Sequence, residues 1–120
     1  MLKNDGLYRM SVSMATLAID LLLKSVLYRI DNTSGLLIGH DHIGILRTIE
    51  KRYSNPELRT VVKLSRKYFN DSRYSNNENV LAFTETLAAD FIRYAQQVKD
   101  FVDIDCQATL EDLQKRFEKL

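Results

Sequence analysis

The chain has 120 residues, of which 45% are hydrophobic and 28% charged, and its formal net charge is +1. This length fits one domain with its own core, and the composition is that of an ordinary globular protein. Four glycines and one proline are too few for a linker-rich or turn-rich β protein. We therefore expect a single domain over residues 1–120.

The start of the chain and its cysteine content bear on the compartment. Charged residues interrupt the first apolar residues, so no secretory signal is predicted. The apolar stretch Leu17–Leu27 contains Asp20 and Lys24 and is too short to span a membrane. Cys106 is alone and has no histidine near it in sequence, so neither a disulfide nor a thiol nucleophile is expected. We expect a cytoplasmic protein without membrane contact.

The first predicted helix covers Leu7–Ile30 and is apolar on more than one side. Asp20 and Lys24 lie four residues apart in the favourable order, with the acidic residue first. Two stripes with helical spacing predict a central helix that is packed on both flanks. The stripes are Met10, Met14, Leu17 and Leu21, and Ile19, Leu23, Val26 and Ile30.

Two further helices are predicted after a loop at residues 31–35. Asp41 is a suitable N-cap for a helix from His42 to about Tyr53. Asn55 and Pro56 are typical of a helix start, because proline fits the first turn. The third helix alternates a buried face with a basic stripe, consisting of Arg59, Lys63, Arg66 and Lys67.

The second half of the chain predicts a loop and two more helices. Residues 71–82 are mostly polar and are expected to form the loop. Thr84 can cap a fourth helix whose apolar face reaches Phe101, and Thr109 can begin a last helix that ends at Leu120. Alternation with a period of two is nowhere sustained. The predicted fold is all-α, an up-and-down antiparallel four-helix bundle with a short fifth C-terminal helix.

Candidate catalytic and metal-binding patterns are weak in this sequence. His40 and His42 stand at a helix start, where we expect them to point to different sides, and no further ligand follows at a fixed spacing. No glycine-rich phosphate loop, nucleophile elbow or paired carboxylate is present. We predict no metal, no cofactor and no catalytic residue.

Charge is unevenly distributed along the chain. Residues 21–73 contain ten Lys/Arg against five Asp/Glu, whereas residues 74–120 contain five against nine. Such asymmetry is typical of a polyanion-binding face or of a self-complementary dimer. The basic stripe has two interpretations, a solvated helix face or a contact surface for phosphate groups.

Three segments, in this order, resemble one known family. Ala18–Lys24 reads AIDLLLK, Gly39-His40-Asp41 opens the second helix, and Lys67–Asn76 reads KYFNDSRYSN. Over residues 12–103 this order is similar to the HEPN domain (higher eukaryotes and prokaryotes nucleotide-binding), a four-helix family, in its non-toxin branch. Asp20 stands where that branch usually has Glu, and Ser75-Asn76 stands where it has Pro-Asp.

The resemblance implies a function and a set of residues. It implies a non-catalytic nucleotide- or polyanion-binding module that acts with a partner such as a minimal nucleotidyltransferase, as a homodimer. The ribonuclease members carry an Arg, four to six intervening residues and then a His, and no Arg precedes His40 or His42 at that spacing. The alternatives are an adaptor bundle that binds a protein and a diverged HEPN ribonuclease. The implied ligand-binding residues are Lys24, His40, Arg73 and Tyr74.

Overall fold

The computed structural model describes residues 2–74, 83–106 and 118, and within these residues it is entirely helical. The α-helices are α1 (Leu2–Ile30), α2 (His42–Glu50), α3 (Leu58–Tyr74) and α4 (Glu85–Asp100). A 3-10 turn, η1 (Gly35–Leu37), precedes α2, and a π-helical turn, η2 (Phe101–Asp105), continues α4. The all-α prediction is confirmed. The predicted fifth helix, from Thr109 to Leu120, lies almost wholly outside the described residues.

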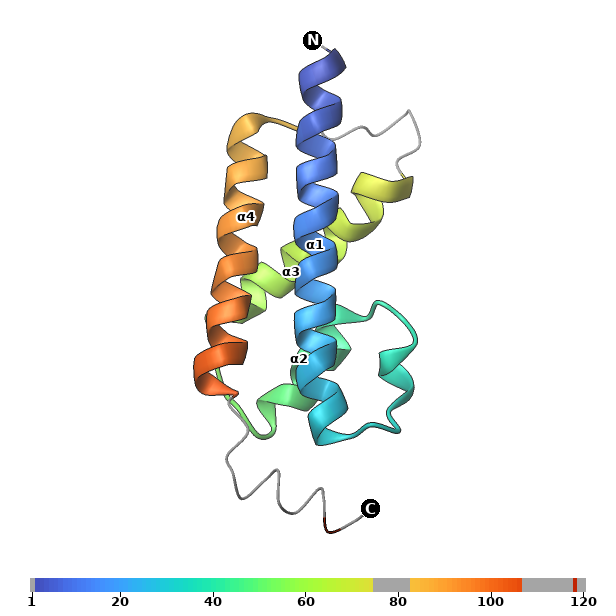
Figure 1. The fold of residues 1–120 in the computed structure, drawn as a ribbon, viewed down its shortest axis with the longest axis vertical. Coiled ribbons are helices and arrows are strands. Elements are labelled where there is room, and N and C mark those ends of the chain that lie inside the picture. The colour runs from blue at the N-terminus through green and yellow to red at the C-terminus, as the bar shows by residue number, and fades with distance from the viewer. Residues whose placement is uncertain (1, 75–82, 107–117, 119–120) are drawn as a thin grey trace.

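The order of the helices in space differs from an up-and-down bundle (Figure 1). α1 and α4 lie side by side and run in the same direction, while α3 crosses α1 obliquely in the opposite sense. The pairing along the core agrees, because Val12 packs in one cluster with Phe91 and Leu27 packs in another with Val102. The physical reason is the segment 31–41, which returns along α1 before α2 begins, so that α2 runs in the sense of α1, α3 runs back, and α4 runs with α1 again (Figure 1). The antiparallel prediction is therefore wrong for α1 and α4.

The two apolar stripes of α1 have different environments. Ile19, Leu23 and Val26 are buried in the core between α2, α3 and α4. Met10 and Met14 are 62% and 64% exposed, and the rest of their stripe is exposed as well. The prediction that α1 is covered on both flanks is therefore wrong for this chain by itself, since one flank faces outward.

The helix starts depend on side-chain caps at two of the predicted residues. The Gly44 amide donates to Asp41 Oδ1 at 3.0 Å, and the Leu87 amide donates to Thr84 Oγ1 at 3.1 Å. Both caps satisfy amides that have no partner inside their helix. α3 begins at Leu58 rather than at Pro56, and the Leu58 amide bonds to the Asn55 carbonyl. α2 ends at Glu50, three residues before the predicted end.

Candidate functional site

A buried carboxylate on α1 is the centre of the candidate site. Asp20 is 1% exposed and lies among core residues of α1. The Lys24 ammonium lies 2.9 Å from Asp20 Oδ2, one helical turn further along, as the spacing predicts. Burying a carboxylate is costly unless charges and hydrogen bonds compensate it, so the surrounding residues have to supply them.

Both histidines converge on this carboxylate, from the segment that leads into α2. His42 Nε2 lies 2.9 Å from Asp20 Oδ1, and His40 Nδ1 lies 3.3 Å from Oδ2. His42 is fully buried, whereas the His40 side chain is 50% exposed. Our expectation that the two point to different sides is wrong. The Asp41 cap turns the chain between them, so that both rings face α1.

The ionisation of Asp20 reflects this environment. Burial by itself raises the pKa of Asp20, but the close contacts and charge of His42 and Lys24 outweigh it and lower the pKa from 3.8 to about 2. Asp20 is therefore an anion at neutral pH. With the Lys24 ammonium beside it, the pair is electrically neutral inside the bundle.

A serine completes a chain of polar groups on the far side of His42. Ser65 Oγ of α3 lies 3.3 Å from His42 Nδ1, so Ser65, His42 and Asp20 follow one another. The order is that of a Ser-His-Asp triad, but Ser65 and His42 are both fully buried. A nucleophile must reach its substrate, so this chain of groups holds α1, α2 and α3 together and does not form an acyl-transfer site.

Phe69 of α3 connects the histidines to Arg73. The Phe69 ring centroid lies 4.5 Å from that of His40 and 5.3 Å from that of His42, where it meets the ring edge-on. The Arg73 guanidinium carbon lies 3.8 Å from the Phe69 centroid, within cation–π range. Lys24, His40 and Arg73 are thus joined through Asp20 and Phe69 in one connected cluster.

Arg73 also ties the end of α3 to α1. Its guanidinium donates to the Ser13 carbonyl at 2.6 Å, to Thr16 Oγ1 at 3.1 Å and to the Phe69 carbonyl at 2.9 Å. The sequence predicted a loop from Asp71, but α3 continues through Tyr74 because Arg73 binds α1 there. Tyr74 is the last residue of α3. Whether Tyr74 binds a ligand stays a prediction.

The basic stripe lies on the exposed face of α3, as its spacing predicts. Arg59 forms a two-pronged ion pair with Glu50, at 2.8 Å between Nη2 and Oε2. The pair lines a groove of about 360 Å³ between α2 and α3, together with Lys63 and Arg47. Arg59, Arg66 and Arg73 are spaced by seven residues and so follow one side of α3. The stripe therefore leads toward the cluster around Asp20.

Four contributors to the cluster were missed by the sequence prediction. Asp20 was identified as the helical partner of Lys24 and by its place in the family pattern, but it was not predicted to be the buried centre of a site. Ser65 and Phe69 lie on the buried face predicted for the third helix, whereas Thr16, which is also fully buried, was in neither predicted stripe of the first helix. The available signal was the mismatch between polar residue types and apolar faces at Thr16, Asp20 and Ser65.

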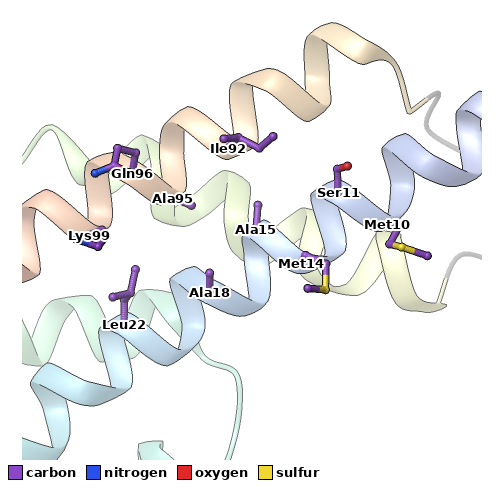
Figure 2. A pocket seen from close by; sticks show the side chains of 10 residues that line it. All are labelled: Met10, Ser11, Met14, Ala15, Ala18, Leu22, Ile92, Ala95, Gln96 and Lys99. Carbon is purple, nitrogen blue, oxygen red and sulfur yellow. The ribbon is translucent and has the colours of Figure 1, made fainter.

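The α1–α4 face forms a second hollow, of apolar character, on the molecule. Figure 2 shows side chains of both helices lining a cavity of about 530 Å³, with Ala15, Ala18 and Ala95 on its floor. Met14 and Ile92 line its sides.

By length and composition, the helical segment Gly6–Ile30 would suffice to cross a membrane, although 44% of its most apolar part is buried within the bundle.

Cys106 follows η2 and is fully buried in the core. Burial raises the pKa of its thiol to about 11, so the thiol is protonated at neutral pH. This protonation state agrees with the expectation that Cys106 is not a nucleophile.

Comparison with known proteins bears on the family. No curated protein and no solved structure matches the chain. The family model of the HEPN domain matches residues 1–105, which include every described helix and the whole cluster around Asp20. The chain therefore belongs to the HEPN domain family, a family of nucleotide-binding or ribonuclease-like modules.

Proposed function

We propose that this chain is a non-catalytic HEPN module that binds the phosphates of a nucleotide or nucleic acid. The observation that carries the proposal is the line of basic side chains from the basic stripe to Arg73 and Lys24, with His40 beside them. Phosphate groups are bound in proteins by such cations, with Arg serving planar, two-pronged contacts and Lys serving as a point charge. His40 is the exposed histidine of the cluster, so its outer edge is accessible to a ligand.

A catalytic role has less support in the same geometry. The Arg-to-His spacing of the ribonuclease members is absent, and the buried Ser65 has no path to a substrate. Beside Asp20, the His40 side chain is 50% exposed, whereas the Lys24 side chain is 16% exposed and is bound to that carboxylate. We therefore assign Lys24, His40 and the basic stripe to binding, with Arg73 and Tyr74 at the end of the line.

The proposed partners follow from the family and from the α1–α4 face. We propose that the chain forms a homodimer in the cytoplasm and acts beside a protein of the minimal nucleotidyltransferase type. The exposed stripe of α1 forms a raised row of large apolar side chains, and the groove beside it is lined by small residues. Such a surface can be self-complementary, as a twofold dimer interface requires. A net charge of +1 leaves little repulsion between two copies.

Binding of a labelled short single-stranded RNA, and of ATP, tests the proposal over a range of salt concentrations. Released counterions drive phosphate binding, so affinity should fall as salt rises. Replacing Lys63, Arg66 or Lys67 by Ala should weaken binding and lower the salt slope by about 1 for each residue. Arg93→Ala, which removes an exposed arginine of α4, is the matched control and should leave binding unchanged. Equal losses in both sets, or no binding at low salt, would contradict the proposal.

A further inference from the structure

The three side chains around Asp20 form a set of metal ligands. Asp20, His40 and His42 each offer one ligand atom, and the three atoms lie within 4.8 Å of one another. Ligands at about 2.0–2.2 Å from a tetrahedral metal stand about 3.3 Å apart. His42 Nε2 lies 2.9 Å from Oδ1 of Asp20 and His40 Nδ1 lies 3.3 Å from Oδ2, so each histidine is close to that spacing from one oxygen of the carboxylate. A small rotation of the half-exposed His40 ring would bring the third pair into range.

Two of these ligand atoms have no hydrogen-bond partner among the described residues. Asp20 Oδ1 and His42 Nε2 are buried, and neither forms a well-shaped hydrogen bond with any described group, although they lie 2.9 Å apart. Buried polar atoms normally have such a partner, so a pair without one needs an explanation. A cation bound between the carboxylate and the ring would satisfy both atoms.

The surrounding residues supply what such a site requires. Ser65 Oγ lies 3.3 Å from the other nitrogen of His42, which is the second contact that orients a metal-binding imidazole. The Phe69 ring packs against both histidines and restricts water on one side. His40 is open to solvent and provides the route by which an ion enters.

We propose that Asp20, His40 and His42 bind a divalent transition-metal ion of the zinc class. Two imidazoles and one carboxylate favour zinc, cobalt, nickel or copper over magnesium and calcium, which prefer all-oxygen ligands. Three protein ligands leave a fourth position for water or a ligand atom. The site lies at the end of the line of basic side chains described above, but the proposal depends only on the geometry of Asp20, His40 and His42.

Lys24 competes with the metal for this site. Its ammonium lies 2.9 Å from Asp20 Oδ2 and 3.4 Å from His40 Nδ1, close to where the metal ion would bind. The metal must displace this tethered cation, and the long flexible lysine side chain can swing aside. Removing the lysine charge should therefore strengthen metal binding, whereas most substitutions in a metal site weaken it.

The test is a titration of the purified, chelator-treated full chain with Co²⁺, whose absorption bands report coordination, and with Zn²⁺ in competition. The native chain should bind one ion, and Lys24→Met should bind about tenfold more tightly because a neighbouring positive charge is gone. His40→Ala should weaken binding about tenfold or more. Asp103→Asn, which changes a half-exposed acidic residue of η2 outside the cluster, is the control and should bind as the native chain does.

The outcomes separate cleanly. His40 is half exposed, so His40→Ala should keep the helical circular-dichroism spectrum, and its loss of binding is then a loss of a ligand. Absence of binding by the native chain, or binding that survives His40→Ala, overturns the proposal. Metal binding by the Lys24→Met variant alone overturns it as well, because the Lys24 ammonium would then occupy the site in the native chain. None of these results depends on whether RNA or ATP binds.

Discussion

Asp20 shows how one buried charge links three helices. Its carboxylate contacts Lys24 on its own helix, His40 just before α2 and His42 at the start of α2. The other ring nitrogen of His42 contacts Ser65 of α3. Breaking such a buried group is more costly than breaking a surface pair, because the remaining partners stay buried without compensation. Its protonation should therefore be visible in the stability of the whole domain.

The pH dependence of unfolding has a definite sign. The pKa of Asp20 is lowered to about 2 in the folded chain from 3.8, so its contribution is complete above about pH 4 and is lost as pH falls toward 2. A shift of this size corresponds to about 2 kcal/mol of unfolding free energy. Urea denaturation of the chelator-treated protein at pH 6 and pH 3 should show a loss of about half of this free energy, because pH 3 lies between the two pKa values. Asp20→Asn should be less stable at pH 6 and should lose part of the pH dependence; an unchanged pH dependence would contradict the assignment.

Arg73 carries a second prediction at the scale of a residue. Arg73→Ala removes three hydrogen bonds to α1 and α3 and the contact with Phe69, so it should cost about 3 kcal/mol of unfolding free energy. Arg66→Ala, an exposed arginine of the same helix, should change stability by less than about 0.5 kcal/mol. Denaturation midpoints measure both. If Arg73→Ala abolishes RNA binding and leaves the midpoint unchanged, Arg73 is a ligand contact and not a fastener.

The sequence predicted some of these residues and not their arrangement. Lys24, His40 and Arg73, which the resemblance named as ligand-binding residues, lie within a single connected cluster, and their binding of a ligand stays a prediction. The convergence of His40 and His42 was not predictable, because it depends on the turn at Asp41 and on the long-range position of α1. Phe69 and Ser65 were assigned to the core, and only the tertiary structure reveals that each also contacts a histidine.

At the scale of an element, local signals located helix starts better than helix ends. The caps at Asp41 and Thr84 are as predicted, since a side-chain oxygen and an amide three residues later form a local pair. The ends of α2 and α3 depend on contacts with other helices. α3 runs past the predicted loop boundary because Arg73 reaches α1, which is more than fifty residues away in sequence.

The Thr84 cap provides a prediction for α4. Thr84→Ala removes the acceptor for the Leu87 amide and should cost about 1 kcal/mol, whereas Thr84→Ser keeps the hydroxyl and should cost little. Urea denaturation of the two variants against the native chain measures the difference. Equal stability of the Ala and Ser variants would mean that water replaces the cap.

At the scale of the whole molecule, the direction of the helices determines the layout. α1, α2 and α4 run in one sense and α3 runs in the other, so α1 and α4 lie parallel with a groove between them, and one stripe of α1 stays exposed (Figures 1 and 2). Helical spacing identified both stripes of α1 as apolar, and it has no means of telling which one a single chain covers. The stripe that a single chain leaves exposed is therefore the surface that the proposed dimer would bury.

The last prediction concerns this exposed face. A second copy that packs its Met10–Leu21 stripe against the groove should give a dimer that buries at least about 1,000 Å² in total. Met14→Glu places a charge at the groove and should give a monomer, because burying an unpaired carboxylate is unfavourable.

Ile38→Glu is the matched control, since Ile38 is 87% exposed and lies after η1, outside the groove. It should stay dimeric if the α1–α4 face is the interface. Light scattering over a range of protein concentrations measures both variants against the native chain. A native chain that is monomeric throughout would contradict the dimer. Dissociation by both substitutions alike would contradict its placement, because charge anywhere on the surface would then be sufficient to separate the copies.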